Sequence, residues 1–394
     1  MRILIATVTA GGGHVAAAAA LEEAWQTMRP DDVVERVDLL KYFSRLHKKL
    51  YQDGYVALVE RAPELWGYVF DKTDNPKFLR RLSRLRRAFP GQSRSKFARH
   101  VKEFKPDVVL CTHYLPLETL GSTRRRSSGI KPDGRTSTSR AKDSNVPRPA
   151  GQPFVVSVVT DFEAHALWMD AGVDLYCVAA EETRARLIAR GATDDHVIAT
   201  GIPIAAKFSS RPDARAIRKS CGLRDDQPVF LVLSGGFGMG PVAEILAELD
   251  NVPLPFQTVV VTGRNDDLRR SLAIQNRRHP THVLGYATNM HELMTVADLI
   301  LTKPGGLTVS EALALGKPLF ILNPIPGQEA ANSDFLLERG AATKVNRMED
   351  LPFRIEKLLG SGKLAGMAKA AKSLGRPSSA NTVCREVLKR LGEI

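Results

Sequence analysis

One stretch of this chain constrains its fold more than any other. Residues 299–332 read LILTKPGGLTVSEALALGKPLFILNPIPGQEAAN. An apolar run is followed by a Pro-Gly-Gly turn, a helix that opens at residues 308–311, and a second apolar run. This order predicts a β-strand, a helix and a parallel β-strand. Open α/β sheets bind ligands outside the carboxyl ends of their strands. The block therefore predicts a ligand site where the start of the helix lies beside the polar loop 326–329.

The composition is that of a soluble globular protein. The chain has 394 residues, 43% hydrophobic and 25% charged, which suits two domains of ordinary size. It opens with MRILIATV before a glycine turn, which predicts a buried first strand rather than a secretory signal. No apolar run reaches the roughly 18 residues needed to cross a bilayer. The four cysteines lack metal-ligand or redox spacing, so we expect reduced thiols in a cytosolic protein.

Alternating apolar runs and helical segments predict a parallel sheet covered on both faces in each half of the chain. In the first half the expected strands are 2–8, 33–39, 106–112, 154–160, 175–179 and 196–200, with a helix over about 14–28. In the second half they are 228–233, 258–262, 282–285, 298–302 and 318–322. Residues 121–150 are rich in Ser, Arg, Gly and Pro, which predicts a disordered loop. We expect domains over 1–207 and 208–380, and a last helix over 381–394.

The basic residues favour an anionic partner. Lys and Arg number 56 against 43 Asp and Glu, a formal net charge of +13. Residues 72–105 hold much of this excess, where an apolar stripe opposes a basic face: Phe78, Leu82, Leu85 and Phe89 against Arg80, Arg81, Arg84 and Arg87. Such a helix either packs with a solvated face or lies in an anionic membrane interface. The aromatic segment just upstream, with Trp66 and Phe70, favours the membrane. Nucleic acid is not expected, because no recognised binding module is present.

Residues 9–14 (TAGGGH) lie between the first strand and the first helix. Gly12 and Gly13 let the backbone approach a ligand closely, and the helix N-terminus offers free N–H groups. His14 falls in the first helical turn, where the helix dipole favours a neutral imidazole that can accept a proton. It is a candidate base, and a turn-capping or sugar-binding role fits the same position. The G-x-G-x-x-A pattern also fits a dinucleotide fingerprint, but the chain lacks other dehydrogenase features.

Two further segments follow expected strands. In residues 160–168 (TDFEAHALW), Asp161 and His165 form either a polar cluster at the sheet edge or a helix cap and a surface histidine. Residues 233–241 (LSGGFGMGP) repeat the strand–glycine–helix order, and we expect their backbone N–H groups to cradle a phosphate. The sequence contains no Asp-x-Asp and no His/Cys metal cluster. N–H groups, helix dipoles and basic side chains would then stabilise a diphosphate without a metal.

Together these segments resemble the glycosyltransferase B (GT-B) superfamily, in particular the monogalactosyldiacylglycerol synthases and bacterial processive diacylglycerol glucosyltransferases of glycosyltransferase family 28. Block 299–332 resembles the donor site, and residues 160–168 resemble the bacterial TDF-x-x-H-x-x-W signature. The resemblance implies two doubly wound Rossmann-like domains facing a cleft, with the last helix returning to the first domain. It implies inverting transfer of glucose or galactose from UDP-hexose to diacylglycerol, with no cofactor.

The resemblance also implies roles for single residues. Glu311 would hold the ribose hydroxyls, while Gln328 and Glu329 would hold those of the hexose. His14 or Asp161 would remove the acceptor proton. Arg264 would be structural or reach the diphosphate, and backbone groups near Ala287 and Met290 would read the uracil unless this turn merely caps a helix. The expected donor site comprises Gly12, Gly13, Ser234, Gly235, Gly236, Arg264, Ala287, Met290, Gly305, Gly306, Thr308, Glu311, Gln328 and Glu329, and the expected acceptor and membrane side comprises His165, Trp66, Phe70, Phe78, Arg80, Arg81, Arg84 and Arg87.

Three alternatives remain open: a lipid-linked peptidoglycan N-acetylglucosaminyltransferase, a UDP-sugar epimerase, and a non-catalytic nucleotide or lipid binder. The segment 160–168 argues against the first, and the basic aromatic surface argues against the second. We expect a peripheral protein on the cytoplasmic face of the cell membrane, whose partners are UDP-hexose, diacylglycerol and anionic lipid.

Overall fold

The computed structural model describes residues 1–9, 11–45, 48–49, 54, 62–75, 91–127, 151–170, 172–210, 212–235 and 240–394. The chain divides into two compact units. Unit 1 comprises Met1–Ala206, Pro326–Gln328 and Ser378–Ile394, and unit 2 comprises Lys207–Ile325 and Glu329–Pro377. Each unit is built on a parallel six-stranded sheet.

The sheet of unit 1 has the strand order β2-β1-β3-β4-β5-β6. Its strands are β1 (Arg2–Thr7), β2 (Val33–Asp38), β3 (Val108–Cys111), β4 (Phe154–Val158), β5 (Leu175–Val178) and β6 (Val197–Ala199). Strands β3, β4 and β5 are buried along their whole length, as expected where helices cover both faces of a parallel sheet. Because β1, β3 and β4 are adjacent and parallel, the residues that follow them meet at one edge.

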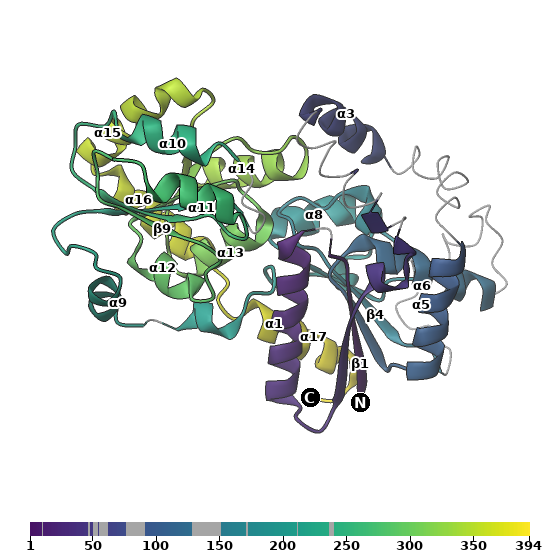
Figure 1. Cartoon of the computed structure of the whole chain (residues 1–394). Coiled ribbons are helices and arrows are strands. Elements are labelled where there is room, and N and C mark those ends of the chain that lie inside the picture. The colour runs from purple at the N-terminus through teal and green to yellow at the C-terminus, as the bar shows by residue number, and fades with distance from the viewer. Residues whose placement is uncertain are drawn as a thin grey trace. The chain divides into compact units, whose positions relative to one another are not determined.

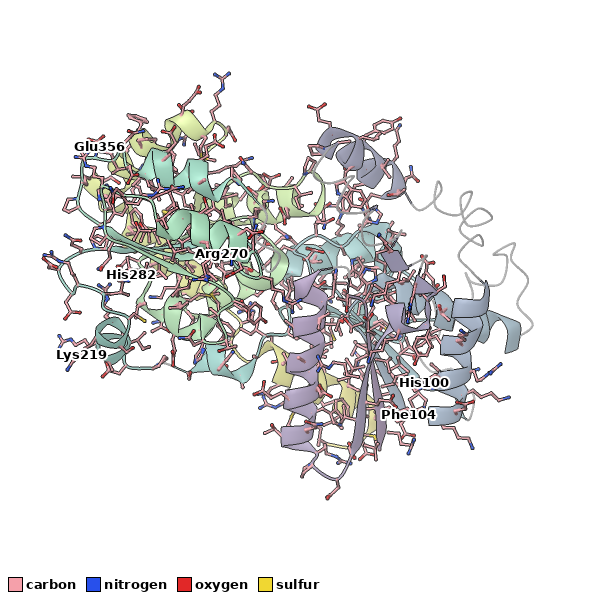
Figure 2. All side chains as sticks on the ribbon, in the orientation of Figure 1. His100, Phe104, Lys219, Arg270, His282 and Glu356 are labelled. Carbon is pink, nitrogen blue, oxygen red and sulfur yellow. The ribbon has the colours of Figure 1, made fainter. Side chains whose placement is uncertain are left out.

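Helices pack on this sheet, and α1 lies beside α17 (Figure 1). The helices are α1 (Gly12–Met28), α3 (Pro63–Thr73), α5 (Gly91–Phe104), α6 (Tyr114–Ser127), α8 (Glu181–Ala189) and α17 (Ser379–Leu391), with 3-10 turns η1 (Leu39–Tyr42), η2 (Ala166–Trp168) and η3 (Asp194–His196). Val383 and Val387 of α17 share a core with Trp25 of α1. A second core includes Phe104 of α5, which stacks on His100 one turn earlier (Figure 2).

Unit 2 has the strand order β12-β11-β10-β7-β8-β9. Its strands are β7 (Val229–Leu233), β8 (Gln257–Val261), β9 (Thr281–Leu284), β10 (Leu299–Thr302), β11 (Leu319–Ile321) and β12 (Ala342–Lys344). Its helices are η4 (Ala206–Ser209), α9 (Ala214–Ser220), α10 (Val242–Leu249), α11 (Asp266–Ala273), α12 (Met290–Val296), α13 (Gly306–Ala314), α14 (Gln328–Glu338), η5 (Met348–Asp350), α15 (Leu351–Gly360) and α16 (Lys363–Leu374). Strands β8 and β9 are added in turn on one side of β7. The chain then returns to the other side of β7 as β10, where β11 and β12 are added in turn. The strand order therefore reverses between β7 and β10.

The prediction of doubly wound α/β units is confirmed, with two local differences. β12 was not expected, because it is a short edge strand with little apolar content. The prediction of a disordered loop over 121–150 is wrong for its first residues, since α6 continues to Ser127. Leu115 and Leu117 anchor this helix in the core, and the backbone at Gly121 lies directly against the Asp170 carboxylate. Residues 128–150 lie outside the described residues.

The predicted ligand block differs from the structure at two helix starts. α13 begins at Gly306 rather than near Thr308, because Gly305 adopts an extended conformation and serves as the N-cap. α14 begins at Gln328, so Gln328 and Glu329 lie in a helical first turn instead of a loop. Gly327, with φ of +89°, makes the preceding turn in a region of backbone space that favours glycine.

Candidate active site

The reversal of strand order between β7 and β10 marks the expected ligand position in unit 2, because open α/β sheets bind ligands where neighbouring connections diverge. Two glycine turns follow these strands. One begins at Ser234 and ends at Gly240, with only Ser234, Gly235 and Gly240 among the described residues, and the other, at 304–306, leads into α13. The predicted phosphate loop and the predicted donor block are therefore neighbours in unit 2.

The described ends of the loop after β7 have backbone angles that favour glycine. Gly235 and Gly240 have φ of +77° and +123°, which L-residues rarely adopt. The hydroxyl of Ser234 is buried and donates to the Val261 carbonyl at 2.9 Å, so it fastens the loop to β8. Its side chain thus has a structural partner, and a ligand would meet backbone groups instead. Gly236 lies outside the described residues.

Glu311 lies in the second turn of α13 and is half-buried. Burial raises the pKa of its carboxyl to about 8, against the opposing positive charge of Lys207. The first turn of α13, which includes Gly306 and Thr308, has no side-chain cap, so its N–H groups stay open to an anion. One helix thus presents N–H donors at its start and a proton-binding carboxyl one turn later.

The other predicted donor residues have different surroundings. The Glu329 carboxylate accepts a hydrogen bond from the Ile325 N–H at 2.8 Å, which stabilises the start of α14. Arg264 is exposed, with its guanidinium carbon 5.5 Å from the centre of the Tyr286 ring. Ala287 and Met290 are half-buried at the start of α12. Lys207 donates to the Thr288 carbonyl at 3.0 Å, which links this turn to the side chain that influences Glu311.

His14 is the centre of a polar cluster in unit 1. Its Nδ1 lies 2.9 Å from the Thr112 carbonyl and 2.8 Å from the Thr160 hydroxyl. The Thr112 hydroxyl in turn donates to the His14 carbonyl at 3.0 Å. A carbonyl oxygen can only accept, so the bond to Thr112 requires the proton on Nδ1. In neutral His14 the lone pair is therefore on Nε2.

The His14 ring is neutral at physiological pH. Burial lowers its pKa to about 4, although the hydrogen bond to the Thr112 carbonyl partly opposes this shift. His113 packs edge-on at 4.8 Å between ring centres, and burial followed by the nearness of His14 lowers the pKa of His113 well below its usual value. Gly12 and Gly13 form the start of α1 just before His14. The cluster provides an uncharged proton acceptor beside a glycine turn.

The TDF-x-x-H segment divides into two parts. Asp161 is half-buried next to Thr160, the residue that contacts His14. His165 accepts from the Leu167 N–H at 3.1 Å through Nδ1, and its Nε2 donates to the Phe70 carbonyl at 3.0 Å. Both of its nitrogens are thus engaged within unit 1. In this conformation His165 fastens the end of α3.

Helix α3 carries the exposed apolar surface of unit 1. Trp66 and Phe70 are half-buried, and the Phe70 ring lies 4.4 Å from that of His165. The exposed side chains of this helix are instead Leu65, Tyr68 and Val69, with 54%, 61% and 38% of their surface accessible. Asp74, which follows the helix, pairs with Arg190 and accepts from the Ala166 N–H at 2.8 Å.

Only part of the basic segment is described. Phe78, Arg80, Arg81, Arg84 and Arg87 lie outside the described residues. The described part is α5, whose Phe97 and Phe104 are buried while Lys96, Arg99 and Lys102 are exposed along one side. None of the helices in the described ranges is long and apolar enough to cross a membrane.

Sequence reasoning missed three side chains of these sites. Thr112 and Thr160 contact His14, and the signal for them was their position at the ends of expected strands. Lys207 lies near Glu311 in a short 3-10 turn that no pattern in the sequence marks. Within the ranges that the structure describes, no three His, Cys, Asp or Glu side chains gather as metal ligands.

Comparison with known proteins identifies the class. A sequence model of the monogalactosyldiacylglycerol (MGDG) synthase family matches residues 14–132 and 146–204, and one of the glycosyltransferase family 28 C-terminal domain matches residues 241–383. MurG of Acinetobacter baumannii aligns over 98% of this chain and 99% of its own, with a TM-score of 0.58 and 16% identity. HepE of Anabaena, in complex with UDP-glucose, aligns over the whole of both chains with a TM-score of 0.53 and 14% identity. The fold is that of the GT-B glycosyltransferases.

Curated relatives define the family. The processive diacylglycerol beta-glucosyltransferase of Bacillus licheniformis is 31% identical over 293 residues, 74% of this chain and 70% of that protein. The enzyme of the same name from Bacillus subtilis is 28% identical over 98% of this chain and 95% of its own length. That of Bacillus pumilus is 35% identical over 59% of this chain and 62% of its own. This chain therefore belongs to the glycosyltransferase family 28 group of monogalactosyldiacylglycerol synthases and processive diacylglycerol glucosyltransferases.

Proposed function

We propose that this protein is an inverting, metal-independent hexosyltransferase that moves glucose or galactose from UDP-hexose to diacylglycerol. Relatives named as processive diacylglycerol beta-glucosyltransferases match it over nearly their whole length, which supports the donor and acceptor classes. The observation that carries the chemistry is the His14 ring, whose Nδ1 is held by the Thr112 carbonyl. This bond leaves the Nε2 lone pair as the proton acceptor.

The proposed reaction is a single displacement. The acceptor hydroxyl oxygen forms a bond to the anomeric carbon while the bond from that carbon to the UDP oxygen breaks, and the electron pair leaves with UDP. The hydroxyl proton passes to Nε2 of His14. A base with a pKa of about 4 is weak but always available, so it accepts the proton late, when the attacking oxygen has become strongly acidic. Asp161 is the second candidate for this role.

Unit 2 would hold the nucleotide of the donor. In this proposal Glu311 binds the ribose hydroxyls, and Gln328 and Glu329 bind the hexose. The N–H groups of Gly235 and Gly240 and those of the first turn of α13 would bind the diphosphate in place of a divalent cation. Turnover then requires an acceptor hydroxyl beside the anomeric carbon of the bound donor.

The membrane would supply the acceptor. We assign membrane contact to the exposed apolar side chains of α3 and the exposed basic side chains of α5, which are Leu65, Tyr68, Val69, Lys96, Arg99 and Lys102. Each basic residue close to an anionic surface contributes about 1 kcal/mol. Flotation with vesicles of neutral and anionic phospholipid tests this assignment. The triple variant Lys96→Gln/Arg99→Gln/Lys102→Gln should lose anionic-vesicle binding, and unchanged binding would remove α5 from the surface.

A direct assay tests the function. Purified protein is incubated with diacylglycerol vesicles and either UDP-glucose or UDP-galactose, in excess chelator, and the product and its anomeric configuration are read by NMR. We expect a β-linked glycolipid and undiminished turnover with chelator, since UDP-hexoses carry the α configuration. No glycolipid from either donor would overturn the proposal, and transfer to a peptidoglycan precursor or epimerisation would replace it. Activity that chelator abolishes and magnesium restores would overturn the metal independence.

The role of His14 has a matched test. His14→Ala should lower kcat by about 100-fold or more without weakening UDP binding. His196→Ala, which removes a half-buried imidazole in the same unit, should leave kcat unchanged. If His14→Ala retains full activity, His14 is not the base, and the same experiment on Asp161→Asn then decides whether that carboxylate replaces it.

A further inference from the structure

Lys303 occupies the reversal point of the unit 2 sheet. It directly follows β10, whose neighbour across the reversal is β7. Gly240 closes the glycine loop that follows β7, and a first side-chain carbon built on Gly240 would lie 3.7 Å from Cε of Lys303. The lysine stem therefore reaches from the end of one central strand to the glycine loop of the other. No motif predicted this placement, because it depends on two strands that are distant in the sequence.

The backbone that carries Lys303 is tightly held. Its carbonyl accepts from the Gly305 N–H at 2.9 Å and from the Thr302 hydroxyl at 3.1 Å. The buried Asn332 amide donates to the next carbonyl, that of Pro304, at 3.0 Å. These bonds fix where the side chain leaves the sheet. A lysine on a fixed backbone loses less entropy when its ammonium binds a ligand than one on a mobile loop.

Lys303 is half-buried as a residue, and its ammonium carries no ion pair with any carboxylate in the described ranges. Two arginines of unit 2, by contrast, have carboxylate partners. Arg218 pairs with Asp298 at 2.9 Å, and Arg277 pairs with Asp250 at 3.1 Å. A cation that lies beside Gly240 and has no carboxylate partner in the described ranges can bind an anionic ligand through a charge-assisted hydrogen bond.

Arg264, the cation that the sequence motifs single out, is less well placed. It follows β8, one strand away from the reversal, and its exposed guanidinium lies over the Tyr286 ring. A guanidinium over an aromatic face already has a favourable cation–π contact. Lys303 has no such ring partner among the described side chains and points toward the glycine loop.

We propose that Lys303 binds the diphosphate of the nucleotide donor and stabilises the UDP that departs. This inference rests on the proposed donor site and adds its cationic residue. Negative charge accumulates on the leaving diphosphate as the bond to the anomeric carbon breaks, so an ammonium contributes more in the transition state than in the ground state. The open N–H groups at the start of α13 act on the same charge.

The test separates diphosphate binding from folding by comparing three ligands. Uridine, UDP and UDP-glucose are titrated into the wild type, Lys303→Met, Lys303→Arg and Lys363→Met by calorimetry. Lys363→Met is the matched control, because it removes an exposed ammonium at the start of α16. Lys303→Met should weaken UDP and UDP-glucose by about tenfold or more and leave uridine unchanged. Lys303→Arg should recover much of the loss, and Lys363→Met should match the wild type.

Each outcome decides the proposal. Equal weakening of uridine and UDP in Lys303→Met would show that the lysine only supports the fold of the site, and unchanged UDP affinity would show that N–H groups or Arg264 suffice. Either result overturns the role of Lys303. The titrations need no lipid, so they stand apart from the acceptor. Selective loss of UDP binding in a protein that glycosylates no diacylglycerol would retain Lys303 and refute only the proposed function.

Discussion

Glu311 should lose a proton when a uridine nucleotide binds. Burial raises its pKa to about 8, so about nine in ten carboxyls are neutral at pH 7 before binding. Ribose hydroxyls would donate to the carboxylate, and each hydrogen bond to a charged group contributes about 1.5–3 kcal/mol. Two such bonds lower the pKa by about two units or more. Binding at pH 7 should therefore release about 0.8 proton or more per site.

Calorimetry measures this release directly. The apparent binding enthalpy at pH 7 is compared in buffers of different ionisation enthalpy, and the slope gives the number of protons released. Uridine is the first ligand because it carries the ribose without phosphate charges, and UDP-glucose is the second. Since the ionised carboxylate is the binding form, uridine affinity should rise by more than about tenfold between pH 6 and pH 8 and then level off.

Two variants make the measurement specific. Glu311→Gln should bind uridine without proton release and with little dependence on pH. Glu356→Gln, which removes an exposed carboxylate of α15 (Figure 2), should behave as the wild type. No proton release by the wild type at pH 7, or the same release by Glu311→Gln, would refute the reasoning that burial prepares Glu311 for the ribose.

Further changes test other parts of the structure. Thr160→Val removes one of the two partners of Nδ1 and should lower kcat, while nitrogen-15 NMR should still find the proton on Nδ1 of His14 because the Thr112 carbonyl remains; Thr160→Ser should preserve kcat as well, and a mixture of tautomers in the valine variant would contradict the role of Thr112. Because the His14 pKa is about 4, kcat at saturating donor should stay level between pH 6 and pH 8, and a fall centred near the ordinary histidine value would mean that the ring is exposed. Asp74→Ala should loosen α3, seen as faster tryptic cleavage within that helix at unchanged UDP affinity. Gly375→Ala would place a carbon 2.3 Å from the Leu313 carbonyl oxygen and should lower the free energy of unfolding by about 1–3 kcal/mol; unchanged denaturant unfolding would show that the backbone yields there.

Most strands could be predicted because they are buried on both faces and so appear as short continuous apolar runs, as in Val229–Leu233. β12 could not, since an edge strand with one buried residue in three has no such signature. The sequence also could not predict which side chains of α3 are exposed. Its aromatic content was evident, but the direction of each side chain depends on where the helix is fastened, and His165 and Asp74 make those bonds from outside it.

The partners of His14 show a second limit. His14, Thr112 and Thr160 follow β1, β3 and β4, and they meet only because these strands are adjacent in the sheet. Local patterns establish that each strand exists but not which strands are neighbours. The same limit applies to Lys303, since its position beside Gly240 follows from the pairing of β10 with β7. Chemistry that depends on strand order therefore emerges only from the fold.

The early start of α13 explains how one short helix can serve two chemically opposed parts of a nucleotide sugar. A helix opening near Thr308 would place Glu311 in its first turn, where the dipole would favour the carboxylate and the charge would repel a diphosphate. Because α13 begins at Gly306 instead, Glu311 lies one turn further along, where burial raises its pKa to about 8. The N–H groups of the uncapped first turn can therefore bind phosphate oxygens. The Glu311 carboxyl keeps its proton until the ribose hydroxyls bind. Moving the helix start by two residues, for example with Thr308→Pro, which disfavours helical backbone at the preceding residue, should therefore disturb diphosphate and ribose binding together, and loss of only one would show that the two functions of α13 are independent.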